Sequence, residues 1–168
     1  MARTTTLKGN PFNLAGPELK VGDKAPDATV RKGFVDDMKL SEHKGQARIY
    51  SVVPSLDTPV CADQTRRFWK EATALPNVKL FTVSCDLPPA QARFCSTEGI
   101  DTEKVKPLSD HKDLDFGTKY GTLIPDLRLQ SRAVFVVDQN DVIRYAEYVP
   151  EIASHPNYEA VLAAAKGL

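Results

Sequence analysis

Residues 49–85 constrain the fold more tightly than any other stretch of the chain. An apolar strand ends at Pro54, a helix fits Pro59 to about Ala74, and a second strand fits Val78–Cys85. A strand, a helix and a second strand over this distance make a βαβ unit, whose strands are normally parallel and joined by a right-handed crossover. The fold should therefore be built on a parallel strand pair with a helix packed against it.

The flanking segments extend this unit into a larger sheet. Thr4–Lys8 and Phe12–Leu14 flank a turn at Gly9–Pro11, which predicts a β-hairpin added to the main fold over residues 1–16. Other patterns predict weak strands at 28–31 and 36–40, short helices at 88–99 and 111–121, a strand pair at 133–137 and 142–146, and a last helix at 158–166 capped by Asn157. Residues 96–110 and 121–131 show no regular pattern. We expect an α/β fold in one domain over 1–168, with a central mixed sheet flanked by helices.

The charge balance narrows the choice of partner and compartment. Lysine plus arginine and aspartate plus glutamate number 22 each, which favours neither nucleic acid nor an anionic membrane as a partner. No apolar run approaches the roughly 18 residues of a membrane span, and Met1–Thr6 lacks the apolar core of a secretory signal. We therefore expect a cytoplasmic protein that binds no nucleic acid and no membrane.

Cys61 occupies an unusual position at the start of the predicted helix. Thr58 suits the N-cap and Pro59 suits the first helical position, so Cys61 falls on the third. The positive end of the helix dipole and the free backbone N–H groups both favour a thiolate there. The alternative is that Cys61 only fills space, because free cysteines are often buried in cores. On the first interpretation Cys61 is a candidate nucleophile.

The remaining cysteines and histidines suggest no cofactor. Three cysteines cannot all pair within one chain, so any disulfide in a reducing compartment is expected to be transient and catalytic. Cys85 follows the alternation of Phe81 and Val83, and we expect it to be a core residue without a catalytic role. The scattered histidines lack ligand spacing for a metal, and no glycine-rich phosphate loop indicates a flavin or nicotinamide site.

Three segments carry a resemblance to a known family. Pro54–Cys61 matches the P-x-x-x-T-x-x-C signature of the peroxiredoxins, which are thioredoxin-fold peroxidases. Asp86–Cys95 resembles the D-L-P-x-A-Q-x-R-F-C segment of their bacterial thiol peroxidase branch, an atypical two-cysteine class, and Arg132–Asp138 extends the similarity. The resemblance covers nearly the whole chain, including the N-terminal hairpin, and implies a thioredoxin-like fold.

The resemblance also implies an activity and a set of site residues. It makes Cys61 the peroxidatic cysteine and Cys95 the resolving cysteine, joined by an intrachain disulfide during the cycle, with Thr58, Pro54 and Arg132 shaping the peroxide pocket. The family's enzymes reduce hydroperoxides with no metal or organic cofactor, take electrons from thioredoxin and are commonly homodimers.

Physical chemistry assigns a task to each of these residues. A thiolate that attacks a peroxide becomes a sulfenic acid and displaces an alkoxide or hydroxide. Donors aimed at the departing oxygen can each supply about 3 kcal/mol, and we expect the Arg132 guanidinium and the Thr58 hydroxyl to act so. Pro54 lacks an N–H and would help to exclude water. The alternatives are that Arg132 pairs with a surface carboxylate, that Thr58 only caps the helix, and that Pro54 only ends a strand.

Two further points remain open at the level of sequence. A disulfide needs Cα atoms within roughly 7 Å, so fully formed helices around Cys61 and Cys95 would have to unwind locally before the disulfide closes.

A protein thiol–disulfide oxidoreductase is a rival function, although the usual C-x-x-C is absent. A redox sensor that uses the same two cysteines without turnover is a second rival.

Overall fold

The βαβ unit expected at residues 49–85 forms the centre of the fold. In the computed structural model, which describes residues 2–168, β5 (Ala47–Val52) and β6 (Val78–Ser84) pair in parallel with Ile49 opposite Leu80. α1 (Pro59–Ala72) connects them, ending slightly before the predicted Ala74. Every residue of β5 is buried, including the polar Arg48 and Ser51, because the strand lies in the interior of the sheet.

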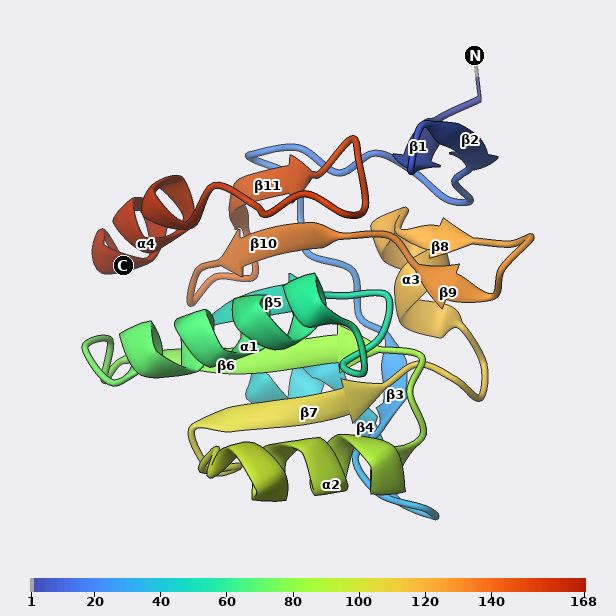
Figure 1. Cartoon of the computed structure of the whole chain (residues 1–168). Coiled ribbons are helices and arrows are strands. Elements are labelled where there is room, and N and C mark those ends of the chain that lie inside the picture. Colours follow the sequence, from blue (N-terminus) through green and yellow to red (C-terminus); the bar gives the residue numbers. More distant parts are fainter. Residues whose placement is uncertain (1) are drawn as a thin grey trace.

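Five further strands complete a mixed seven-stranded sheet in the order β11-β10-β5-β6-β7-β3-β4 (Figure 1). β7 (Val105–Ser109) is parallel to β6, and β10 (Ala133–Val137) is antiparallel to β5. The outer strands β11 (Ile143–Tyr148), β3 (Thr29–Arg31) and β4 (Asp37–Lys39) all pair antiparallel to their neighbours. The predicted mixed α/β sheet is therefore confirmed.

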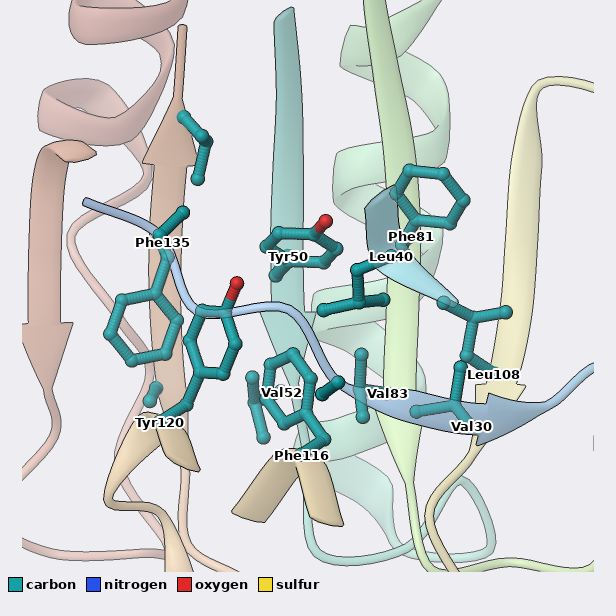
Figure 2. Close-up of a cluster of buried hydrophobic side chains, with 14 of the residues drawn as sticks. Val30, Leu40, Tyr50, Val52, Phe81, Val83, Leu108, Phe116, Tyr120 and Phe135 are labelled. Atoms are coloured by element: carbon teal, nitrogen blue, oxygen red, sulfur yellow. The ribbon is translucent and has the colours of Figure 1, made fainter. Parts of the chain in front are cut away.

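Helices cover both faces of the sheet, as expected. α1, α2 (Pro88–Glu98) and α4 (Tyr158–Lys166) contribute side chains such as Phe68, Cys95 and Val161 to one apolar cluster on one face. α3 (Asp115–Tyr120) and the short 3-10 helix η1 (Leu40–His43) cover the other face, where Phe116 and Tyr120 stack with ring centroids 4.1 Å apart (Figure 2). α4 has its predicted limits, and Asn157 Oδ1 accepts from the Ala160 N–H as its cap.

Two segments predicted to be irregular contain strands. β7 lies within residues 96–110, where Lys106 and Pro107 interrupt any apolar alternation, and its pairing comes from the neighbouring strand β6. β8 (Leu123–Ile124) and β9 (Leu129–Gln130) form a small ladder within residues 121–131. These predictions were wrong because tertiary pairing, which the local sequence does not encode, stabilises all three strands.

The N-terminal hairpin forms, with a shifted turn. β1 (Thr4–Leu7) pairs antiparallel with β2 (Asn10–Asn13), so the turn lies at Lys8 and Gly9 rather than at 9–11. Both turn residues have positive φ, 52° and 79°, the conformation that a two-residue hairpin turn requires. The Thr6 N–H donates to the Pro150 carbonyl at 2.8 Å, which attaches the hairpin to the segment after β11.

Within residues 2–168, none of the helices combines the length and the apolar character needed to cross a membrane.

Candidate active site

The start of α1 holds Cys61 as the sequence predicted. Thr58 is the N-cap residue with extended backbone angles, Pro59 is the first helical residue, and Cys61 follows within the first turn. Cys61 is only 1% exposed and packs with Val53 and Leu56 in a small apolar cluster. The thiol is therefore buried at the positive end of the α1 dipole.

Thr58 caps the helix by position but not through its side chain. Its hydroxyl donates to the Ser55 carbonyl at 2.8 Å and makes no hydrogen bond to the N–H groups of the first turn. The side-chain cap assumed from the sequence is therefore wrong. The hydroxyl proton is engaged within the loop, and the oxygen of this exposed residue keeps lone pairs that can accept a hydrogen bond.

Arg132 lies directly against the sulfur of Cys61. Its Nη2 donates to Cys61 Sγ at 3.3 Å, although the two residues are 71 positions apart. The strand register explains the approach: Ala133 at the start of β10 is opposite Val52 at the end of β5, so Arg132 reaches the point where the chain leaves β5. The sheet thus delivers a permanent positive charge to the thiol.

The other donors of this guanidinium are fixed inside the protein. Nε donates to the Ile152 carbonyl and Nη1 to Gln64 Oε1, both at 2.8 Å, and Arg132 is 2% exposed. Among residues 2–168 it forms no salt bridge, so pairing with a surface carboxylate, one of the alternatives above, is wrong. A buried cation with directed partners cannot swing away from the sulfur without losing hydrogen bonds.

Gln64 is a site residue that the sequence argument missed. It is fully buried one helical turn after Cys61, and its Nε2 donates to Ser51 Oγ at 2.8 Å. Since the amide nitrogen is occupied by Ser51, the amide oxygen faces Arg132. The available signal was a polar residue at the (i, i+3) spacing from Cys61 on a helix face that otherwise packs inward.

Pro54 lies in the loop between β5 and α1 and is buried. The strand ends at Val52, and the Val53 N–H still donates to the Val83 carbonyl of β6 at 2.9 Å. Pro54 therefore follows the last sheet hydrogen bond of this segment, at a position where the missing N–H leaves no donor unpaired.

Cys95 lies in α2 in different surroundings. It is 2% exposed and belongs to the apolar cluster that includes Ile100 and Val105, and burial raises the pKa of its thiol. Phe94 packs against both this cluster and the one around Cys61. Both cysteines are free thiols here, on separate helices and in separate clusters, with the Phe94 ring contacting both clusters.

A groove of about 620 Å³ lies between α1 and α2. Near the start of α1 it is lined by Leu56, Thr58 and Pro59. Farther along, Arg66 of α1 donates from Nε and Nη2 to the carboxylate of Glu98 at the end of α2, at 2.6 and 3.0 Å. The groove gives a ligand access to the first turn of α1, and the ion pair ties the two cysteine-bearing helices together.

Cys85 differs from the core residue that its alternation predicted. β6 ends at Ser84, so Cys85 is half-buried beyond the strand, and Gln130 Nε2 donates to its Sγ at 3.6 Å. Burial, followed by the nearby Asp110 carboxylate, raises the pKa of this thiol to about 12. The prediction from the alternation of Phe81, Val83 and Cys85 failed because side chains alternate between the two faces of a sheet only within a strand, and β6 ends at Ser84. The expected lack of a catalytic role stays a prediction.

Within residues 2–168, no three or more histidine, cysteine, aspartate or glutamate side chains are grouped so that they could hold a metal ion. The chemistry that the site offers is that of sulfur beside a fixed cation.

The fold is a thioredoxin-like sheet, and its site places a buried cysteine in the first turn of α1 with an arginine against the sulfur. These features define a redoxin-type thiol enzyme. Residues 20–162 match the Redoxin family model. The chain is 56% identical over 157 residues to a thiol peroxidase of Oceanobacillus iheyensis, covering 94% of each protein. It is 52% identical over 163 residues to a thiol peroxidase of Bacillus subtilis, covering 97% of this chain and 96% of the relative.

Solved structures agree with these relatives. A peroxiredoxin-like protein from Aquifex aeolicus superimposes with a TM-score of 0.90 at 42% identity, covering 99% of this chain and 98% of that one. A thiol peroxidase from Chromobacterium violaceum shares the fold, with a TM-score of 0.87 at 20% identity over 98% of this chain and 95% of that one. The chain belongs to the thiol peroxidase branch of the peroxiredoxins, and the resemblance seen in its motifs is confirmed.

Proposed function

We propose that this thiol peroxidase reduces hydrogen peroxide and organic hydroperoxides through Cys61. The observation that carries the proposal is the 3.3 Å contact between Arg132 Nη2 and Cys61 Sγ at the start of α1. A thiolate at this position attacks one peroxide oxygen, the O–O bond breaks, and the sulfur is oxidised to a sulfenic acid. The departing oxygen takes up a proton and leaves as water or an alcohol.

Arg132 supplies the electrostatic part of this step. Its charge is held by Ile152 and Gln64 before the peroxide arrives, so little reorganisation is needed when negative charge moves from sulfur to the departing oxygen. Thr58 fits a complementary task. Because its hydroxyl donates to Ser55, its oxygen accepts the O–H of the hydroperoxide, rather than donating as the sequence argument assumed. Pro54 excludes water from the oxidised sulfur.

Cys95 completes the oxidative half of the cycle. Its thiolate attacks the Cys61 sulfenic acid, an S–S bond forms, and the hydroxyl leaves as water. Both sulfurs are buried in separate clusters, so α2 and the first turn of α1 must unwind locally for this bond to form. Identical backbones around Cys61 and Cys95 in reduced and oxidised structures would refute the unwinding.

Thioredoxin is the proposed reductant. Its dithiol supplies two electrons, reopens the Cys61–Cys95 disulfide and becomes a disulfide itself. Every step balances with thiols and peroxide alone, without a metal or an organic cofactor. We further propose an antioxidant role in the cytoplasm, where reducing systems keep thioredoxin supplied, and a homodimer, which rests on the family resemblance.

The test is peroxide consumption with thioredoxin and its reductase. Cys61→Ser should abolish turnover, Cys95→Ser should abolish the thioredoxin-driven part, and Cys85→Ser should retain activity. Activity that survives Cys61→Ser would overturn the assignment of the nucleophile. Oxidation of wild-type protein once, without repeated turnover, would support the redox sensor instead.

A further inference from the structure

Asp86 links the two segments that carry Cys61 and Cys95. It lies between the end of β6 and the start of α2, and its carboxylate accepts three hydrogen bonds. Oδ1 accepts from Ser55 Oγ at 2.7 Å, while Oδ2 accepts from the Leu56 N–H at 2.8 Å and from Ser84 Oγ at 2.7 Å. Two of these donors belong to the loop that leads into α1.

The carboxylate is itself anchored to the sheet and to α2. Gln91 of α2 donates to Ser84 Oγ at 3.0 Å, and Ser109 at the end of β7 donates to the Asp86 carbonyl. On the other side, Leu56 is 4% exposed and packs in the same cluster as Cys61. A continuous path of hydrogen bonds and packing therefore runs from the sheet through Asp86 and Leu56 to the reactive sulfur.

We propose that Asp86 is a positioning residue for the reduced enzyme, an inference that rests on the proposed role of Cys61. It holds the 55–58 loop so that the sulfur and the Thr58 oxygen face the peroxide together. Its role is geometric, because a carboxylate in the groove beside α1 opposes a thiolate electrostatically. Displacement of a reacting group by about 1 Å can slow an enzyme by about a hundredfold.

The two effects of Asp86 predict opposite results for Asp86→Asn. The amide nitrogen cannot accept from Leu56 or from a serine hydroxyl, so the loop loses part of its anchorage. If position decides, oxidation of Cys61 slows by about tenfold or more. If charge decides, removing the negative carboxylate makes the reaction faster.

The experiment isolates the first chemical step in a Cys95→Ser background. The reduced protein is mixed with hydrogen peroxide, quenched at intervals by alkylation, and the remaining Cys61 thiol is measured by mass spectrometry of its peptide. If Cys95→Ser alone shows no oxidation of Cys61, the proposed function fails. If it reacts and Asp86→Asn in the same background reacts as fast or faster, only the present inference fails.

Asp110→Asn is the matched control. Asp110 follows β7 as Asp86 follows β6, and it accepts from the Phe116 and Gly117 N–H groups and from Gln130, so it anchors α3 rather than the Cys61 loop. Both substitutions should lower the melting temperature, but Asp110→Asn should leave the oxidation rate within about twofold. Equal slowing by both variants would overturn the inference.

Ser55→Ala keeps the test decisive if Asp86→Asn does not fold. It removes the donor to Asp86 Oδ1, together with the acceptor of the Asp57 N–H at 3.2 Å, and leaves the Leu56 and Ser84 bonds to Asp86 in place. A slowing of a few-fold with an unchanged melting temperature supports the inference, and an unchanged rate overturns it.

Discussion

Cys61 and Cys95 are equally buried, but the groups around their sulfur atoms differ in chemistry. The side chains of Cys61 and Cys95 are 1% and 2% exposed. Cys61 lies in the first turn of α1 beside the Arg132 guanidinium, whereas Cys95 packs among apolar side chains, and this burial raises the pKa of its thiol. Burial alone therefore does not decide whether a thiol reacts. The groups around each sulfur differ: Cys61 Sγ accepts a hydrogen bond from a guanidinium, whereas desolvation among apolar side chains raises the pKa of the Cys95 thiol.

Replacing the guanidinium that donates to Cys61 should produce the largest effect on this thiol. Arg132→Lys keeps a cation but cannot reach Ile152, Gln64 and Cys61 together. We expect the rate of Cys61 oxidation to fall about 10²–10³-fold, the cost of losing one preorganised donor. Stopped-flow mixing with hydrogen peroxide measures it. Arg144→Lys, on an exposed arginine paired with Asp138, is the control and should react normally.

Freeing the guanidinium should produce a smaller effect. Gln64→Met preserves volume but leaves Arg132 Nη1 without its amide partner, and we expect oxidation to slow about tenfold, equivalent to about 1.4 kcal/mol. Gln130→Met removes a similarly buried glutamine beside Cys85 and is the control. If both variants oxidise at the same rate, Gln64 does not orient the arginine.

Loosening α2 should affect Cys95 and leave the first step alone. Glu98→Gln weakens the ion pair with Arg66, which is partly exposed, so disulfide formation should accelerate by only about two- to fivefold. Quenched-flow measurement of the disulfide after one peroxide equivalent reports this rate. Asp63→Asn breaks the other ion pair of Arg66, which lies within α1, and should leave disulfide formation unchanged. A slower disulfide in Glu98→Gln would contradict the need for opening.

The surroundings of Cys95 should also appear in the alkaline stability of the enzyme. Because burial raises the folded-state pKa of this thiol, the folded state retains a proton that the unfolded state loses above about pH 8.5. The contribution of this thiol to the free energy of unfolding is therefore fully present below that pH. It is lost as the pH rises, by at most about 1.4 kcal/mol per pH unit for one proton. In urea unfolding from pH 7 to 10, the free energy of unfolding should decline less steeply with pH in Cys95→Ser than in the control Ser96→Ala. Ser96 is the exposed neighbour of Cys95.

Some features followed from local sequence and others did not. The limits of α4, its Asn157 cap and the place of Cys61 within the first turn of α1 were predictable, because capping and periodicity depend on neighbouring residues. The strand at 105–109 was missed because Pro107 and the polar residues around it give no alternation, and its partner β6 lies elsewhere in the chain. The prediction that Cys85 is a core residue was wrong because an alternating pattern does not indicate where a strand ends.

The sequence by itself determined the family, the order of strands and helices around residues 49–85, and the cysteine at the positive end of α1. The family resemblance already pointed to Arg132, but only the tertiary structure decided how its guanidinium is held against that sulfur. The register of β10 on β5 brings Arg132 to the sulfur, and Gln64 and Asp86 hold the arginine and the loop in place. The physical reason is range: helix ends form from neighbouring residues, whereas a buried charge is positioned by strands that pair across the chain.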